Sequence, residues 1–575
     1  MTFSRPNTVD RAAPPGRRRR LRTSITIGAV AGLCAAAVVT ATPASAFVPQ
    51  GASSQVGSGN SFSPQVVHTA QGPTGYAVTF RFKDPTATRV QIKGEWYFSD
   101  PAQTTTTSSQ GLLPQQWVPG VVPMAYPQST GANWPVQNLT QDGRTGIWSI
   151  TVPLPSGMFT YGFFVNCASA TGAGCQEISD PSNPPWNSIN GVSSGSTEPD
   201  SEVYVPSDPA FGTTNYSWQS PSTTHGNLVA VSYPSPQSIT PAGTHPLAVY
   251  TPPNYDPFRS TPYPTLYLSH GGGGQEIDWS TQGAAGNILD NLITSKQIQP
   301  MVVVMTNFNG LPRGAEPYAQ DLISNVIPYV QKFYNVSTSA ADRAFAGLSV
   351  GGAYANNLLY NHTAEFGYYS VMSNAGGNPA TVTPEQATAL KAVTAIQIGG
   401  GIQDPLRPQT TAALAALTGA GVPFTDDSIN GGHEWYVWRI LLHDFLVQQA
   451  FKGTSTTLTT TTDGKGVTTA ATATVTKVGT TGAAPTGTVQ FRLDGALLRA
   501  PVKLRSGTAS ITLPRSITAG RHTLTATYSG DSQHAPSSAT TVISGKKATS
   551  KVATPTPAPA TRVPSTTKAL VAHTS

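Results

Sequence analysis

Alternating apolar and polar positions mark two separate β-rich regions in this chain. In the first region, apolar side chains recur at every second position in Tyr76–Phe82 and Ile147–Val152, and Met158–Val165 continues the pattern. In the second region, short strand-like runs lie between turn residues in Gly487–Gly495 and Gly507–Leu513. A period of two places successive side chains on opposite faces of a strand. The pattern therefore predicts an all-β sandwich near each end of the chain.

The region between them has a different pattern, in which continuous apolar runs are followed by turn residues. Pro264–His270, Arg343–Leu348 and Ala392–Ile398 are such runs, and the last part of the region, Tyr436–Gln449, has a helical pattern. Continuous apolar runs of this length are typical of strands that are buried on both faces, as in parallel sheets. The central region is therefore predicted to contain buried strands and a C-terminal helix.

One of these runs ends in a motif that carries chemistry. Gly347-Leu-Ser349-Val-Gly351 follows an apolar strand and leads into the helix-compatible segment Ala353–Tyr360, which is the sequence form of a nucleophile elbow. A second match, at Gly191–Gly195, lies in a Ser/Gly/Pro-rich stretch with neither a strand before it nor a helix after it. The context therefore selects Ser349 as the nucleophile.

An acid and a histidine are expected after the nucleophile, in that order. Asp404 follows the apolar strand at 392–398, and His433 lies between a Gly-Gly turn and Trp435. Asp426 or Asp427 could replace Asp404, although neither follows a buried strand directly. The predicted catalytic triad is Ser349, His433 and Asp404.

Other polar residues of this region have structural interpretations. His270 precedes the elbow in chain order and is predicted to position a loop, while His443 lies within the C-terminal helical pattern and is predicted to pack. Asp321 is expected to cap or orient a helix. The run Gly271–Gly274 follows a strand at the place where an oxyanion hole receives one backbone N–H, and the residue after the nucleophile, Val350, supplies the other.

The motifs together resemble those of the "Putative esterase" (esterase D-like) family, which includes feruloyl and acetylxylan esterases, enterochelin esterases and mycolyltransferases. The resemblance covers roughly residues 213–452 and rests on four motifs in the family's order: Tyr250–Asp256, His270–Gly274 with Asp278 and Trp279, Ala346–Gly352, and Gly431–Trp435 with Trp438. It implies an α/β-hydrolase fold with a Ser349–His433–Asp404 triad, and an oxyanion hole formed by Gly272 or Gly273 and Val350. Many relatives carry methionine where this chain has Val350. The implied mechanism needs no metal and no organic cofactor.

Residues in or beside the loops around this site are candidates for the substrate pocket. They could stack on a phenolic acyl group or a sugar, and ordinary packing explains each of them about equally well. These pocket candidates are Trp279, Asn307, Phe308, Tyr318 and Trp435.

The N-terminus has the pattern of an export signal. A basic segment at 17–22 precedes an apolar core at 25–39 that is too short to span a membrane, and Ala44-Ser-Ala46 is a small-residue cleavage site. Ordinary secretion and the twin-arginine route are both open. Residues 1–46 carry seven arginines and one aspartate, which accounts for the whole net charge of +6. A secreted, extracellular protein is therefore predicted, with cell-wall association as an open alternative and with no transmembrane segment in the mature chain.

Charge and cysteine content refine this prediction. Residues 47–452 hold 14 basic and 24 acidic residues, whereas residues 453–575 hold 13 and 3, so the basic C-terminal part favours acidic surfaces such as cell-wall polymers. No motif for nucleic-acid binding is present. Cys167 and Cys175 remain after export, and in an oxidising exterior their spacing suggests one disulfide bond that closes a hairpin loop.

Resemblances also describe the flanking regions. The N-terminal β region, with Asp180–Pro184, resembles the early-set, immunoglobulin-like carbohydrate-binding module of family 48, and packing on the esterase is favoured over independent glycan binding. The second β region is similar to bacterial Ig-like domains and is predicted to be a spacer or adhesion module. The predicted organisation is a signal peptide (1–46), an N-terminal β-sandwich (47–212), an α/β-hydrolase domain (213–452), an Ig-like domain (453–545) and a disordered Pro/Thr/Ala-rich tail (546–575).

The resemblance and the motifs predict a serine carboxylesterase that acts on acylated carbohydrate, of the feruloyl or acetylxylan type, or on a small ester. Three alternatives stay open: an acyltransferase of the mycolyltransferase kind, an enterochelin-type esterase, and a cell-wall adhesion protein with an inactive esterase domain. Product release that depends on Ser349 distinguishes the enzymes from the adhesion protein.

Overall fold

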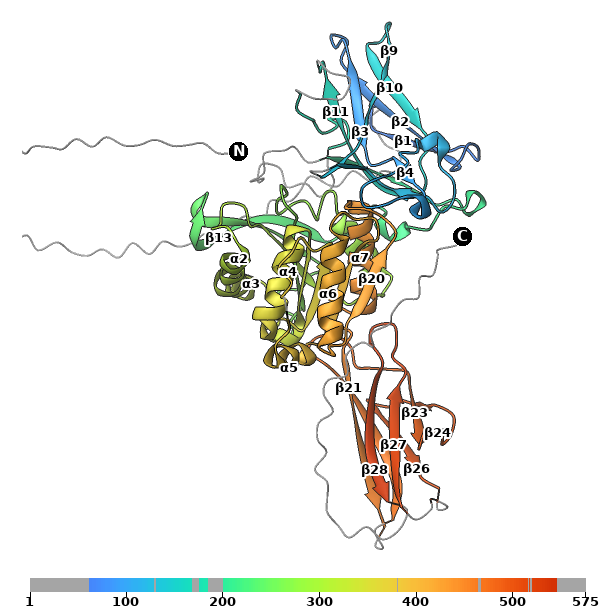
Figure 1. The fold of residues 1–575 in the computed structure, drawn as a ribbon, viewed down its shortest axis with the longest axis vertical. Coiled ribbons are helices and arrows are strands. Elements are labelled where there is room, and N and C mark those ends of the chain that lie inside the picture. Colours follow the sequence, from blue (N-terminus) through green and yellow to red (C-terminus); the bar gives the residue numbers. More distant parts are fainter. Residues whose placement is uncertain are drawn as a thin grey trace, which may run out of the picture. The chain divides into compact units, whose positions relative to one another are not determined.

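The computed structural model describes most of the chain between residues 62 and 544 (Figure 1). The described residues are 62–128, 131–167, 175–184, 200–379, 381–463, 467–514, 517 and 520–544. The predicted signal peptide, the predicted disordered tail and the second Gly-x-Ser-x-Gly match at 191–195 lie outside the described residues.

The described residues from 62 to 205, called the N-terminal module below, form two four-stranded antiparallel sheets of strand order β1-β2-β10-β9 and β12-β11-β3-β8. The predicted strand Ile147–Val152 is β10, and it pairs with β2 along its full length. Apolar residues from both sheets share one buried cluster, which includes Phe80, Trp96 and Phe163. The strands are β1 (Gln65–His68), β2 (Tyr76–Lys83), β3 (Val90–Gly94), β4 (Phe98–Ser99), β5 (Val122–Pro123), β6 (Tyr126–Gln128), β7 (Gly131–Asn133), β8 (Val136–Asn138), β9 (Thr140–Asp142), β10 (Ile147–Val152), β11 (Gly157–Val165) and β12 (Ser201–Val205), and the 3-10 turns are η1 (Pro101–Gln103) and η2 (Pro114–Gln116).

An eight-stranded sheet lies at the centre of the next part of the chain. Its order is β13-β14-β16-β15-β17-β18-β19-β20, with antiparallel pairing at the β13 edge and parallel pairing from β16 to β20. The five parallel strands from β15 to β19 are buried along their whole length, as their continuous apolar sequences predict. The strands are β13 (Asn227–Ile239), β14 (Ala242–Thr251), β15 (Thr265–Ser269), β16 (Val302–Thr306), β17 (Arg343–Leu348), β18 (Tyr368–Met372), β19 (Ala395–Gly401) and β20 (Thr425–Ile429).

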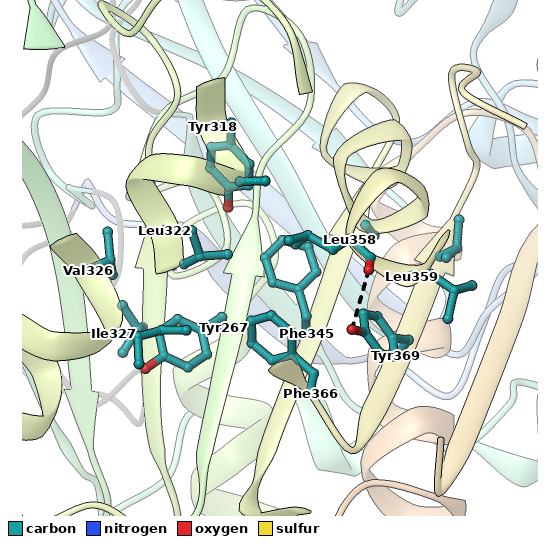
Figure 2. Close-up of a cluster of buried hydrophobic side chains, with 14 of the residues drawn as sticks. Tyr267, Tyr318, Leu322, Val326, Ile327, Phe345, Leu358, Leu359, Phe366 and Tyr369 are labelled. Atoms are coloured by element: carbon teal, nitrogen blue, oxygen red, sulfur yellow. Dashed lines mark hydrogen bonds between the residues drawn. The ribbon is translucent and has the colours of Figure 1, made fainter. Parts of the chain in front are cut away.

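Helices cover both faces of this sheet (Figure 1). Side chains of α1 and α7 belong to one buried cluster, and side chains of α2 to α6 belong to a second cluster on the other face. Figure 2 shows part of the second cluster, in which Phe345 of β17 lies between side chains such as Tyr267 and Leu358. The helices are α1 (Ala285–Thr294), α2 (Ala315–Asp321), α3 (Ile327–Phe333), α4 (Val350–Asn361), α5 (Pro384–Ala392), α6 (Arg407–Gly419) and α7 (Trp435–Gln448), and the short turns are η3 (Pro209–Phe211), η4 (Ser217–Gln219), the π-helical η5 (Leu322–Val326), η6 (Ala340–Asp342) and η7 (Thr363–Glu365).

The described residues from 453 to 544, called the C-terminal module, form another pair of antiparallel sheets, of order β21-β22-β26 and β24-β23-β27-β28. Their apolar residues make a separate buried cluster that includes Val475, Phe491 and Tyr528. The strands are β21 (Thr454–Thr462), β22 (Thr468–Lys477), β23 (Thr488–Leu493), β24 (Ala496–Leu497), β25 (Val502–Lys503), β26 (Thr508–Thr512), β27 (Arg521–Tyr528) and β28 (Ser537–Ser544).

The predicted disulfide bond is present between Cys167 and Cys175. Within the described residues, no helix combines the length and the apolar character needed to cross a lipid bilayer.

Candidate active site

Ser349 lies in the sharp turn between β17 and α4. Its backbone has φ 54° and ψ −114°, a conformation that non-glycine residues rarely adopt and that costs on the order of 1–3 kcal/mol. The surrounding structure holds it, because its N–H donates to the carbonyl of Met372 at 3.0 Å and its carbonyl accepts from the N–H of Ala375 at 3.0 Å. The turn places the side chain at the carboxyl end of the parallel strands, where open α/β sheets bind their ligands.

Glycine is needed on either side of this turn because other backbone approaches too closely for a side chain. A Cβ atom at Gly347 would lie 2.2 Å from the carbonyl oxygen of Gly351, and one at Gly351 would lie 2.4 Å from that of His270. Neither position can hold a larger residue without displacing backbone. The Gly-x-Ser-x-Gly pattern is thus explained by packing between β17, α4 and the end of β15.

His433 and Asp404 reach Ser349 from the loops that follow β20 and β19. The Nε2 atom of His433 lies 3.0 Å from Ser349 Oγ, and its Nδ1 atom lies 2.9 Å from Asp404 Oδ2. The side chain of Asp404 is 1% exposed and that of His433 is 23% exposed. Asp404 Oδ1 also accepts the N–H of Leu406 at 2.7 Å, which fixes the carboxylate.

The other candidates for acid or base have different contacts. Asp426 accepts from the N–H and hydroxyl of Ser428, and Asp427 accepts from the side chain of Gln397. The ring of His443 stacks on Trp218 at 4.3 Å between centroids. Asp404 is therefore the carboxylate that the structure brings to His433.

His270 and Asp321 also have structural contacts. His270 is fully buried, with Nδ1 2.7 Å from the carbonyl oxygen of Gly271 and Nε2 3.4 Å from Asn307 Oδ1, and burial lowers its pKa to about 4. A neutral imidazole that holds the start of the glycine loop agrees with a loop-positioning role. Asp321 accepts hydrogen bonds from Tyr233, Ser235 and Asn325 at the end of α2.

The glycine loop lies directly against the nucleophile turn. A Cβ atom at Gly271 would be 3.2 Å from the Cβ of Ser349, and one at Gly272 would be 3.2 Å from Cγ2 of Val350. Gly273 has φ +79°, which suits glycine, and its surroundings are open. Gly272 therefore lies against Val350, the first residue of α4, where the helix dipole favours negative charge.

Most of the predicted pocket residues are buried in the structure. Trp279 is 0% and Tyr318 is 2% exposed, and Figure 2 shows Tyr318 among the side chains of the hydrophobic cluster. Asn307 is 1% and Trp435 is 8% exposed, and the Trp435 ring packs edge-on against Trp279. Sequence reasoning recognised aromatic residues near the loops, but burial depends on how the helices close over the sheet.

Phe308 is the pocket candidate that is partly exposed. Its ring stacks on His270 at 4.0 Å and meets the ring of Tyr354 edge-on at 5.0 Å. Tyr354, which is also partly exposed, was not a candidate on sequence grounds. It lies four residues after Val350 in α4, so helical periodicity places both residues on one face, and this spacing was the available signal.

Two further residues next to the triad were also missed. Gln403 precedes Asp404 and Glu434 follows His433, and both side chains are buried. Glu434 accepts a hydrogen bond from the backbone N–H of Ala125, 309 residues earlier in the chain. No pattern in the sequence links residues so far apart.

Within the described part of the chain, no group of three or more His, Cys, Asp or Glu side chains has an arrangement suited to a metal ion. The triad and the glycine loop together can support nucleophilic attack on a carbonyl carbon with proton transfer through an imidazole.

The sheet order, the strained serine between a parallel strand and a helix, and the Ser349–His433–Asp404 hydrogen bonds define an α/β-hydrolase domain. Residues 240–448 match the family model described as "Putative esterase", and residues 453–544 match "Bacterial Ig-like domain (group 3)". The chain thus contains a region that matches an esterase family model, followed by a region that matches an Ig-like family model, with a β-rich module before them.

Similar proteins are known from several bacteria. An endo-1,4-beta-xylanase/feruloyl esterase of Xylanibacter ruminicola is 34% identical over 242 residues, which are 40% of this chain and 32% of that protein. Endo-1,4-beta-xylanase Y of Acetivibrio thermocellus is 33% identical over 142 residues, which are 23% of this chain and 13% of that protein. The chain therefore spans a third or less of these two relatives.

Solved structures include similar chains. The feruloyl esterase module of Clostridium thermocellum with sinapinate has a TM-score of 0.36 and 25% identity, and the match covers 41% of this chain and 91% of the module. The enterobactin esterase of Shigella flexneri, solved with enterobactin, has a TM-score of 0.40 and 18% identity, with coverage of 65% and 92%.

Proposed function

We propose that this protein is a serine carboxylesterase. The observation that carries the proposal is the continuous hydrogen-bonded series from Ser349 Oγ through His433 to Asp404, at 3.0 and 2.9 Å, on a strained nucleophile turn. Such strain is retained where the surrounding structure and the function require it. An inactive adhesion domain would have no need of this geometry.

The distances support one assignment of roles. His433 Nε2 takes the proton of Ser349 as Oγ attacks the ester carbonyl, and Asp404 Oδ2 accepts the Nδ1–H, which holds the tautomer and stabilises the imidazolium. The alcohol leaves with the proton returned by His433, and an acyl-enzyme remains. His433 then takes a proton from water, which attacks the acyl carbon and regenerates Ser349.

The negative charge that develops on the carbonyl oxygen needs donors close to Ser349. The N–H of Val350, at the N-terminus of α4, and that of Gly272 or Gly273 are the proposed donors, because the glycine loop lies against Ser349 and Val350. The loss of one such donor typically lowers kcat by about 10² to 10³.

We propose acylated plant polysaccharide, carrying feruloyl or acetyl esters, as the substrate. The resemblance to the xylanase/feruloyl esterase of Xylanibacter ruminicola supports the acyl group. The partly exposed rings of Phe308 and Tyr354 beside the glycine loop could stack on a phenolic acid.

We also propose that the protein is secreted, with cleavage after Ala46. The Cys167–Cys175 disulfide bond supports this, because such bonds persist in oxidising compartments. The N-terminal residue of protein collected from the culture medium would test the cleavage site.

The proposed activity is tested by product release from feruloylated xylan, acetylated xylan and a trehalose acyl ester, with and without an acceptor sugar. We expect free ferulate or acetate from wild-type protein and a loss of at least about 10⁴-fold in Ser349→Ala, because the triad acts as a unit. Ser193→Ala, which alters the second Gly-x-Ser-x-Gly match, is the matched control and should keep full activity.

Other results of this assay would support a different function. Transfer of the acyl group to the acceptor sugar, in place of release to water, would identify an acyltransferase. Equal rates for wild-type protein and Ser349→Ala would contradict the proposed function.

A further inference from the structure

The two loops that carry His433 and Asp404 are both hydrogen-bonded to the N-terminal module. We call residues 402–406 the acid loop and residues 430–434 the histidine loop. In each loop, the contact is made by the residue next to the triad member, Gln403 in the acid loop and Glu434 in the histidine loop. The module therefore touches the polypeptide that holds two of the three triad residues.

Glu434 connects the histidine loop to the module through both carboxyl oxygens. Oε1 accepts the backbone N–H of Ala125 at 3.0 Å, and Oε2 accepts the N–H of Gly432 at 2.8 Å. Glu434 is 4% exposed. A buried carboxyl group of this kind restrains the peptide on each side of His433, because losing either of its hydrogen bonds would leave a buried polar group without a partner, which is costly.

Gln403 makes a second, independent connection. Its Nε2 atom donates to the carbonyl oxygen of Pro101 at 3.2 Å, and its Oε1 atom accepts the N–H of Gly431 at 2.9 Å. The side chain is 6% exposed. One amide thus joins the acid loop, the histidine loop and the module.

Pro101 and Ala125 belong to one ordered stretch of the module, residues 97–125. The N–H of Met124 donates to the carbonyl of Tyr97 at 2.9 Å, and β4 pairs with β5. Phe98 and Trp117 of this stretch are buried in the core of the module. The groups that meet the catalytic loops are therefore held by a folded core.

A separate contact attaches the module to α7. Arg439, which is 1% exposed, donates to Glu95 Oε2 at 2.7 Å and to the carbonyl of Met158 at 2.6 Å. Glu95 also accepts the N–H of Thr160. In the described part of the chain, the Glu95 carboxylate accepts hydrogen bonds from Arg439 and Thr160, so this attachment can be changed without removing a hydrogen bond of the acid loop or the histidine loop.

We propose that Glu434 and Gln403 are positioning residues, and that residues 97–125 of the N-terminal module are an integral part of the active site. They hold the imidazole of His433 and the carboxylate of Asp404 in line with Ser349. This inference rests on the proposed function. It assigns the module a role in the reaction itself, in place of independent glycan binding.

The experiment uses the full chain and two readouts: the rate of labelling by an alkyl fluorophosphonate, and kcat and KM for 4-nitrophenyl acetate. The labelling needs an activated serine but no knowledge of the natural substrate. The variants are Glu434→Gln, which replaces one acceptor oxygen by an amide N–H donor, and Gln403→Met, which keeps the volume but loses both hydrogen bonds. Glu95→Gln is the matched control, since it weakens attachment and leaves both loop contacts intact.

We expect Glu434→Gln and Gln403→Met to lower kcat and the labelling rate by roughly 10- to 100-fold, because small displacements of catalytic groups have effects of this size. KM should change by less than about threefold, and circular dichroism should show folded protein at the assay temperature. Glu95→Gln should have a lower Tm and a wild-type labelling rate.

Three results separate the possible failures. Wild-type protein that is not labelled would overturn the proposed function. Labelled wild-type protein, with both variants labelled at the same rate, would overturn the positioning role alone. If Glu95→Gln slows labelling as much as Glu434→Gln, then attachment in general is responsible, and the specific role of the two loop contacts is wrong.

Discussion

The two β modules that flank the hydrolase domain contact opposite ends of its parallel strands. The N-terminal module reaches the loops after β19 and β20, where Asp404 and His433 lie. The C-terminal module contacts Asp342, which immediately precedes β17, and Tyr368, the first residue of β18. Since β17 has six residues, its two ends are about 20 Å apart.

This difference indicates different roles for two modules of similar architecture. In open α/β sheets, ligands bind at the carboxyl ends of the strands, so a module attached there can affect chemistry. A module attached at the other end can affect stability and leave the catalytic geometry unchanged. The position of the contacts, more than the type of fold, separates the two modules.

The largest effect is expected from Arg439→Met, which removes the ionic contact to the N-terminal module. Glu95 would then remain buried without its cation, and such a loss typically destabilises a protein by about 3–5 kcal/mol. The free energy of the unfolding transition that involves this module, measured with urea and tryptophan fluorescence, gives the value. The double variant Arg439→Met with Glu95→Met should recover much of the loss, since no unpaired charge is left, and a double variant as unstable as the single one would contradict this account.

A smaller effect is expected from Asp342→Asn at the junction with the C-terminal module. The carboxylate accepts hydrogen bonds from the backbone N–H and hydroxyl of Thr480 and from Thr481 and Ser337. An amide can accept at only one of its two ends, so we expect a loss of about 1–3 kcal/mol. kcat and KM should stay within about twofold of wild type, and a tenfold fall in kcat would contradict the proposed division between the modules.

The smallest effect, a change of Tm with pH, should differ between the two junctions. Burial raises the pKa of Glu434 to about 8. The hydrogen bond from the Ala125 N–H lowers this pKa, whereas the nearby charges of Asp404 and Glu95 raise it further. Burial also raises the pKa of Asp278 to about 7. The folded protein then binds protons that the unfolded chain, with carboxyl pKa values near 4, releases. Stability from these groups is present at low pH and decreases as pH rises from about 5 to 8.

The contribution of Asp342 to stability changes with pH in the opposite direction. Burial raises its pKa, but the hydrogen bonds from Thr480, Ser337 and Thr481 outweigh burial and leave the pKa below the usual value. Its contribution is present above the unfolded pKa, near 4, and is lost as pH falls through the folded pKa. Calorimetry of wild type and Glu434→Gln at pH 5 and pH 8 tests whether Glu434 lowers stability as pH rises. The Tm of the variant should decrease less than that of wild type between these two pH values. Asp342→Asn should differ from wild type mainly in how steeply Tm changes with pH below pH 4.

Much of the fold and the triad could be predicted because the signals are local. The continuous apolar sequence of β17, the glycines at 347 and 351, and the helical segment after Ser349 lie within twenty residues and specify a strand, a turn and a helix. The alternation in Ile147–Val152 predicted β10 with its observed ends. Chain order then led to Asp404 and His433, whose distances to one another the structure supplies.

Contacts between distant segments could not be predicted in the same way. Glu434 meets Ala125 across 309 residues, and Arg439 meets Glu95 across 344. Trp279 and Tyr318 were expected near the substrate but are buried, because α1, α2 and α7 close over them. Periodicity and turn chemistry act over a few residues and so specify the elements and the order of the catalytic groups. The attachment of each module and the burial of each aromatic residue depend on the packing of whole surfaces, which exists only when the chain has folded.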